Sequence, residues 1–338
     1  MTMPNQARTT KGTLFVTSSE VETSLTNRSK RVRDSSVRAG LAYLLGMTEK
    51  EYRGRIAPSP TGFLHLGHAM TFWYAQERAR ETDGKLVLRI EDLDRDRCRQ
   101  KFVDAISEDL HWFGLDWNEG PDIGGPFAPY IQSERGRYYS EAWEKLRVGG
   151  FVYPCKCSRK DVMQALLAPH DENEEPIYPG TCRPNSSSVG AAVPAANPLP
   201  AADTAFSTGT HWRFRVPDDE RIDFIDERLG KQSAVAGRDF GDFIIWRRDN
   251  VPAYQLAVVV DDAAMEISEV VRGEDLLTST FRQLLLYRAL DLRPPKFYHA
   301  PLVLGEYGER LAKRHGALSL RALRESGISP EAARASKV

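Results

Sequence analysis

One fourteen-residue segment, at positions 55–68, limits the possible folds of this chain more than any other: R-I-A-P-S-P-T-G-F-L-H-L-G-H. Arg55, Ile56 and Ala57 fit the end of a strand over 52–57, and the prolines and glycine that follow predict a turn. Apolar residues at helical spacing then predict a helix over 66–82. The sequence therefore predicts a strand, a tight turn and a helix in succession.

The start of this helix would suit a phosphate group. Its free backbone N–H groups and the positive end of the helix dipole attract anions. Gly67 lies between His65 and His68 and has no side chain, so a flat ring could rest on the backbone. An ordinary strand–loop–helix connection with two surface histidines is the alternative, and one H-x-x-H does not decide between them.

The complete segment resembles the signature R-x-A-P-S-P-T-G-x-L-H-x-G-H of class I aminoacyl-tRNA synthetases of the glutamyl and glutaminyl branch, where it carries the HIGH element. The resemblance implies a glutamate site formed by Arg55, Ile56, Ala57, Pro58 and Ser59. It also implies that His65, Gly67 and His68 bind ATP and that the two histidines are catalytic.

The rest of the chain predicts an α/β fold. Apolar runs and periodic segments predict strands over 85–90, 212–216 and 253–260, and helices over about 98–113, 134–149, 278–290 and 317–334. Strands that alternate with helices of this length predict a parallel sheet with crossover helices. With the resemblance, this becomes a Rossmann-like class I catalytic domain.

Composition and resemblance together predict the domain order. Residues 1–48 are rich in Ser, Thr and Arg and predict a disordered leader, although a transit peptide or a true start at Met47 are alternatives. Residues 49–150 and 251–316 would form the two halves of the catalytic domain, and 151–250 an insertion whose Ala/Pro/Ser-rich stretch 185–210 is flexible. Residues 317–338 would form a helical tail, with no anticodon-binding domain.

A second motif, G-E-R-L-A-K-R at 308–314, resembles the KMSKS loop of the same family. Lys313 matches the lysine that acts on the phosphates of ATP, so the resemblance implies a catalytic and ATP-binding role for it. Adenylate formation builds negative charge on phosphate, which a mobile cation stabilises. Arg310 and Ala312 depart from the family's lysine and serine, and a solvated charge run is the simpler alternative.

Three further residues complete a predicted glutamate pocket. Glutamate needs cations for two carboxylates and an anion for its ammonium, and the guanidinium fork suits a carboxylate. Arg272 in V-R-G-E-D-L-L, Tyr254 in P-A-Y-Q-L and Glu91 in R-I-E-D match the family's substrate contacts, beside Arg55. The alternatives are a core tyrosine, an arginine at a strand end, and surface ion pairs of Glu91 with Arg89 or Arg95.

Cys155, Cys157 and Cys182 predict a metal site, because thiolates are good zinc ligands and usually act in sets of four. The resemblance implies Tyr178 as the fourth ligand of one structural zinc ion, in a Cys-x-Cys…Tyr-x-x-x-Cys pattern. His170 is the chemical rival, since histidine is the commoner ligand. Three reduced, buried thiols are the remaining alternative.

Composition excludes several other classes of protein. Net charge is −1 with 28% charged residues, so a basic nucleic-acid coat is excluded. No apolar run reaches the roughly 18 residues that a membrane span needs, and no secretory signal or disulfide scaffold is evident. Neither G-x-x-x-x-G-K-[ST] nor G-x-G-x-x-G occurs. We expect a cytoplasmic, monomeric protein without a membrane partner.

Within this branch, a catalytic half that carries the cysteine pattern resembles the glutamyl-queuosine tRNA(Asp) synthetases. The resemblance implies that the chain activates L-glutamate with ATP and Mg²⁺, without needing tRNA for activation. It would then transfer the glutamyl group to queuosine in the anticodon loop of tRNA(Asp). A truncated glutamyl-tRNA synthetase that charges a tRNA 3′ end, and a non-catalytic zinc-bearing RNA-binding paralogue, are the alternatives.

Overall fold

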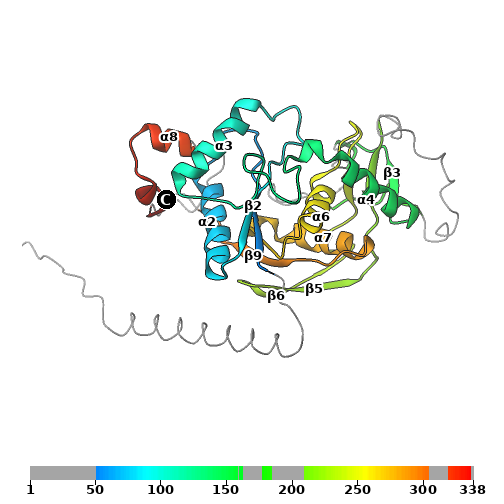
Figure 1. Ribbon diagram of the computed structural model, residues 1–338. Coiled ribbons are helices and arrows are strands. Elements are labelled where there is room, and N and C mark those ends of the chain that lie inside the picture. Colours follow the sequence, from blue (N-terminus) through cyan, green and yellow to red (C-terminus); the bar gives the residue numbers. More distant parts are fainter. Residues whose placement is uncertain (1–50, 159, 163–176, 185–208, 304–318, 336–338) are drawn as a thin grey trace, which may run out of the picture. The chain divides into compact units, whose positions relative to one another are not determined.

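The computed structural model describes residues 51–158, 160–162, 177–184, 209–303 and 319–335 (Figure 1). These residues belong to one compact unit, Glu51–Val338. The predicted leader 1–48, nearly all of the predicted flexible stretch 185–210, His170 and the loop with Lys313 lie outside the described residues. Within the described part, no helix combines the length and apolar character that crossing a bilayer requires.

The predicted strand–turn–helix at the start of the fold is confirmed. Strand β1 (Arg53–Ile56) is buried along its length and pairs in parallel with β2 (Lys85–Leu88). Helix α2 (Leu66–Glu81) connects them and packs against both. Strand β8 (Glu269–Gly273) lies on the other side of β1, where the Ser268 backbone N–H donates to the Arg53 carbonyl at 2.9 Å.

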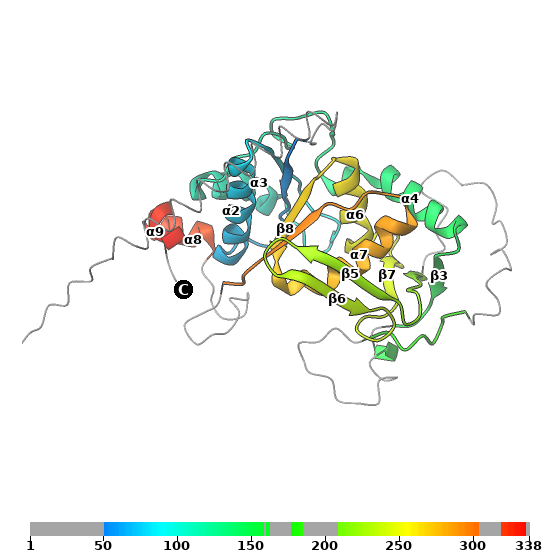
Figure 2. The ribbon, with the colours of Figure 1, turned by 90° about the horizontal axis from the view of Figure 1, so that it is seen from below.

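A second sheet has mixed strand directions and the order β6-β5-β9-β8. Strand β9 (Lys296–Ala300) pairs in parallel with β8, and helix α7 (Leu277–Ala289) connects them after a 3₁₀ turn, η3 (Glu274–Leu276). The hairpin of β5 (Arg221–Asp226) and β6 (Gly230–Val235) continues this sheet, since Asp226 pairs with Phe297 of β9 (Figure 2). A part of the predicted insertion thus adds strands to the catalytic sheet.

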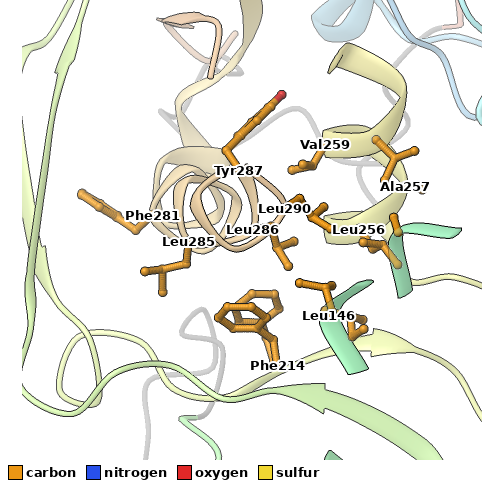
Figure 3. Close-up of a cluster of buried hydrophobic side chains, with 14 of the residues drawn as sticks. Leu146, Phe214, Leu256, Ala257, Val259, Phe281, Leu285, Leu286, Tyr287 and Leu290 are labelled. Carbon is orange, nitrogen blue, oxygen red and sulfur yellow. The ribbon is translucent and has the colours of Figure 1, made fainter. Parts of the chain in front are cut away.

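A third, antiparallel sheet contains β3 (Val152–Cys155), β4 (His211–Phe214) and β7 (Phe243–Trp246), so the predicted strand near 212–216 is confirmed. Helix α4 (Gly136–Val148), preceded by η1 (Gln132–Glu134), packs against β3 and helix α6 (Tyr254–Ala264). Figure 3 shows Leu146 of α4 and Phe214 of β4 meeting apolar side chains of α6 and α7. One core therefore joins this sheet to the helices beside the catalytic sheet.

Helix α3 (Gln100–Phe113) forms the predicted amphipathic helix, with Ile106, Leu110 and Phe113 buried. Two short helices near the end of the described chain, α8 (Leu320–Glu325) and α9 (Pro330–Ala335), pack against it. They confirm the helical prediction for 317–334 in the part that the structure describes.

The strand predicted at 253–260 is wrong: this segment begins helix α6 (Tyr254–Ala264). The run L-A-V-V-V suggested a strand because its residues are apolar and mostly β-branched. Leu256 to Val260 are all buried, however, so the helix shows no polar stripe in this region (Figure 3). Periodicity alone cannot separate a fully buried helix from a buried strand.

Candidate active site

A cavity of about 490 Å³ lies at the carboxyl ends of β1 and β8 and at the first turns of α2 and α6. Its walls include all but one of the described residues that were predicted to bind glutamate or ATP: Arg55, Ala57, Pro58, Ser59, His65, Gly67, His68, Glu91, Tyr254 and Arg272. Ile56, the last residue of β1, is the exception, because its side chain is fully buried in a hydrophobic core.

Arg55 supplies a cation to the cavity wall from the end of β1. Its side chain is buried, and Nη1 donates to the Val271 carbonyl of β8 at 2.8 Å. Nε lies 3.5 Å from Asp262 Oδ1 and has no hydrogen-bond partner among the described residues. A buried donor without an acceptor costs free energy, so this position favours a ligand with an acceptor oxygen.

Arg272 is a second cation in the wall, near the end of β8, and only 4% of it is exposed. Nη1 donates to Gln283 Oε1 at 2.9 Å, Nη2 to Thr280 Oγ1 at 2.7 Å, and Nε to His299 Nε2 at 3.3 Å. Burial, with the nearby Arg55 cation adding to it, lowers the pKa of Arg272. All three guanidinium nitrogens are therefore held from within the protein.

Glu91 is the anion of the wall, and it belongs to a buried ionic network. Arg89, fully buried, lies 3.0 Å from Glu91 Oε1, 2.7 Å from Asp262 Oδ1 and 3.8 Å from Asp261 Oδ2. Burial raises the pKa of Glu91, and the Arg89 cation opposes this shift. The alternative that Arg89 forms a surface ion pair is wrong. The network instead brings balanced charge into a region that excludes water.

Asp261, on the far side of the network, contacts residues behind the cavity. Arg135 Nε lies 2.6 Å from Asp261 Oδ1, and Tyr139 Oη donates to Asp261 Oδ2 at 2.9 Å. Gln132 Nε2 donates to the same oxygen at 2.8 Å. The carboxylate is thus bound by three residues from η1, the start of α4 and the residue between them, which ties α6 to this segment.

Tyr254 is the first residue of α6 and lines the cavity with 39% of its surface exposed. Desolvation raises the pKa of its phenol, which therefore stays protonated and able to donate a hydrogen bond. The alternative of a core tyrosine is wrong.

The opposite wall of the cavity is the start of α2. His65 is its N-cap residue, and the rings of His65 and His68 are 6.2 Å apart. Among the described residues, apart from its chain neighbours and the backbone of its own helix, a methyl group added at Gly67 would have only Val303 within 4 Å, at 3.9 Å. Such a group would enter the space between Gly67 and Val303, both of which line the cavity.

Further lining residues escaped sequence reasoning: Thr61, Thr71, Phe72, Asp275, Leu276, Leu302 and Val303. Asp275 and Leu302 follow the carboxyl ends of β8 and β9, which is where open α/β sheets bind ligands. That rule could have found them once the strands were assigned.

A separate group of donors lies by β3. The sulfur atoms of Cys155, Cys157 and Cys182 are all within 4.8 Å of one another. Tyr178 Oη lies 3.5 Å from the sulfurs of Cys155 and Cys157, and Cys157 Sγ lies 3.5 Å from Cys182 Sγ. We call these four residues the cysteine cluster. Ligands around tetrahedral zinc are roughly 3.5–3.8 Å apart, so the donor set fits such an ion.

One cation lies against the cysteine cluster. Arg213 Nε donates to Cys155 Sγ at 3.3 Å, and its guanidinium lies 3.8 Å from the centre of the Tyr178 ring. Although burial opposes the shift, hydrogen bonds from the Lys156 backbone and from Tyr178 lower the pKa of Cys182 to about 7. The lowered pKa favours the thiolate form of Cys182, which is the form that binds metals. The three cysteines together could bind a metal ion.

Comparison with known proteins identifies the family. The family model described as tRNA synthetases class I (E and Q), catalytic domain, matches residues 51–336. A Glutamyl-Q tRNA(Asp) synthetase from Symbiobacterium thermophilum is 49% identical over 82% of this chain and 83% of its own, and one from Nitratidesulfovibrio vulgaris is 47% identical over 82% of each.

Among solved structures, a glutamate tRNA ligase from Elizabethkingia meningosepticum in complex with its amino acid is 30% identical, with a TM-score of 0.63. That match covers 82% of this chain but only 53% of the ligase, so this chain spans about half of its length. The chain belongs to the class I tRNA synthetases of the glutamyl and glutaminyl branch and, within it, to the Glutamyl-Q tRNA(Asp) synthetase family.

Proposed function

We propose that this chain joins L-glutamate to ATP, giving glutamyl-adenylate and pyrophosphate, and then transfers the glutamyl group to queuosine in tRNA(Asp). The observation that carries the proposal is one cavity that contains two buried arginines, a buried glutamate and the start of a helix. Its chemistry matches the needs of an amino acid with two carboxylates and of a triphosphate.

Glutamate would lie at the end of the cavity formed by β1, β8 and α6. Arg55 and Arg272 would each bind one carboxylate, and Glu91 would accept hydrogen bonds from the ammonium group. Tyr254 and Ser59 would donate hydrogen bonds to the same substrate. Because the arginines are held before the ligand arrives, little reorganisation is needed on binding.

ATP would lie along the start of α2, with Gly67 admitting a flat ring and His65 and His68 beside the phosphates. The α-carboxylate of glutamate would attack the α-phosphate, and the bond to pyrophosphate would break. Mg²⁺ bound to ATP would supply charge neutralisation at the phosphates. Lys313, outside the described residues, would add a cation beside the phosphates.

In the second step a hydroxyl of the queuosine cyclopentene-diol would attack the activated carbonyl, releasing AMP. The cavity would contribute positioning and charge stabilisation, and no protein nucleophile is needed. Activation would not require tRNA.

We also propose that the cysteine cluster holds one structural zinc ion through Cys155, Cys157, Tyr178 and Cys182. The mutual distances of their donor atoms support this assignment. The ion would fix the loop of Cys182 to the end of β3.

Glutamate-dependent exchange of labelled pyrophosphate into ATP tests activation. We expect exchange without tRNA, and for Arg272→Gln a rise in glutamate KM of at least about a hundredfold, as expected for a lost charged hydrogen bond of roughly 3 kcal/mol. Arg221→Gln, at an exposed position of β5, is the matched control. Exchange only with tRNA would contradict tRNA-independent activation, and no exchange under either condition would contradict the enzyme.

Transfer of labelled glutamate to tRNA(Asp) with and without queuosine tests the acceptor. We expect label only on the queuosine-containing tRNA, and no label on that tRNA when periodate has cleaved its cyclopentene diol before the reaction. Equal labelling of both tRNAs would contradict the proposed acceptor and favour a 3′ end.

A further inference from the structure

The guanidinium of Arg272 is held by residues that do not line the cavity. Thr280 and Gln283, on successive turns of α7, and His299, on β9, accept hydrogen bonds from its three nitrogens. The strand register places His299 directly beside Arg272, because the two are partners in the parallel β8–β9 pair. These three residues therefore hold the guanidinium of Arg272 from outside the cavity wall.

The hydrogen bonds also determine the protonation of His299. An arginine only donates, so His299 Nε2, which lies 3.3 Å from Arg272 Nε, must be the unprotonated nitrogen. Thr280 accepts from Arg272 and can in turn donate to His299 Nε2 at 3.0 Å. The ring proton then resides on Nδ1, which lies 2.7 Å from Asp226 Oδ2.

Asp226 fixes this arrangement from the far side of the ring. Both its side chain and that of His299 are fully buried. Asp226 Oδ1 accepts from the backbone N–H groups of Arg228 and Leu229, at 3.0 and 2.8 Å, in the β5–β6 turn. Although burial opposes the shift, these bonds and His299 lower the pKa of Asp226, so it remains an acceptor for Nδ1–H.

We propose that Asp226 and His299 are positioning residues for glutamate. Asp226 sets the tautomer of His299, and the unprotonated Nε2 of His299 orients Arg272 toward the substrate carboxylate. The inference rests on the proposed glutamate site. It assigns a role to the β5–β6 hairpin, whose end supplies Asp226 although the hairpin itself is outside the cavity wall.

If Asp226 and His299 only stabilised the fold, the effect of a substitution would not depend on an acceptor for Arg272. Two substitutions of His299 distinguish this purely structural role from the positioning role. The side-chain oxygen of glutamine reaches the place of Nε2, so His299→Gln keeps an acceptor for Arg272 and Thr280. The amide of asparagine reaches only the place of Nδ1, so His299→Asn keeps a donor for Asp226 and loses the acceptor. Both remove the ring and its packing against Phe297.

The measurement is the glutamate KM and the ATP KM in pyrophosphate exchange, together with the melting temperature of each variant. We expect His299→Asn and Asp226→Asn to raise the glutamate KM about ten- to a hundredfold, the range for one misplaced charged hydrogen bond, with the ATP KM changed less than about threefold. His299→Gln should raise the glutamate KM clearly less than His299→Asn.

Equal glutamate KM values for His299→Gln and His299→Asn, or equal rises in the KM of both substrates, would overturn the proposal. If the His299 variants do not fold, Thr280→Val and Thr280→Ser replace them. The first removes the hydroxyl that links Arg272 to His299 and should raise the glutamate KM, whereas the second should not. An inactive wild-type chain would instead refute the proposed function.

Discussion

The cavity and the cysteine cluster are both built from ionisable groups, but they differ in how their charges are balanced. In the cavity, buried arginines and carboxylates already contact one another, as Arg89 contacts Asp262 at 2.7 Å. In the cysteine cluster, four donor atoms face one another. Among the described residues, Arg213 is the one cation with a contact to a sulfur of this cluster, at Cys155. The charges of the cavity can therefore be balanced before its ligand binds, whereas the zinc ion proposed for the cluster would come from outside.

The largest test of this contrast removes the cation at the centre of the cavity network. Arg89→Met should reduce the free energy of unfolding by about 3–5 kcal/mol, because it leaves Glu91, Asp261 and Asp262 buried without their shared partner. Urea unfolding at pH 7.5 measures the loss. Arg137→Met, which removes an exposed ion pair with Glu141, is the control, and a similar small loss for both variants would contradict a preformed network.

The second test withdraws the external cation. With free zinc a hundredfold above its dissociation constant, chelation should lower the unfolding free energy by about 2.7 kcal/mol. Cys182→Ser should be less stable from the start and insensitive to the chelator. Elemental analysis should find about one zinc ion per wild-type chain. Cys98→Ala is the control, because Cys98 lies outside the cluster, and it should contain the same amount of zinc as the wild type. An equal response of wild type and Cys182→Ser to the chelator would contradict the site.

A pH series tests the support behind the cavity. Burial, with the Arg272 cation adding to it, lowers the pKa of His299, so the unfolded chain takes up a proton near pH 6.5 that the folded chain does not. Stability therefore falls as pH drops below the unfolded pKa. Between pH 7.5 and 5.5 the wild type should lose up to about 1.4 kcal/mol more than His299→Gln in urea unfolding. Identical pH slopes would show that His299 does not contribute.

The smallest expected effect distinguishes the space available to ATP at Gly67 from the stability of helix α2. Gly67→Ala should stabilise α2 by up to about 1 kcal/mol, because alanine favours a helix, and yet raise the ATP KM severalfold by filling the space near Val303. The glutamate KM should change little. Gly136→Ala is the control, at the first turn of α4, where the added methyl group would meet no described residue within 4 Å beyond its chain neighbours and its own helix backbone. It should share the stability gain without the change in ATP KM.

The parts of the fold that local pattern specifies could be predicted from the sequence. Strand β1, helix α2 and helix α3 follow from turn residues and amphipathic spacing. Helix α6 could not, because Leu256 to Val260 are all buried and their sequence resembles a strand. The pairing of Asp226 with Phe297 joins distant segments of the chain, and neither segment carries a local signal for it.

The candidate site divides in the same way. Residues that occur in motifs, such as Arg55, Glu91 and Arg272, could be placed in one pocket, and the structure brings them together. The groups that hold them could not. Thr280, Gln283 and His299 become partners of Arg272 only through the packing of α7 and β9 against β8. Sequence order alone contains little information about such contacts.

Asp261 and Asp262 lie in the last turn of helix α6. Their position lowers the stability of the helix itself, whatever packs against it. Two carboxylates in the last turn of a helix oppose its dipole, which favours cations there. An engineer who optimised the helix in isolation would exchange Asp262 for lysine. That exchange would place a positive charge against Arg55 and Arg89, so a change that improves the isolated helix would disrupt the pocket. The final turn of α6 is thus a local compromise that the whole site requires.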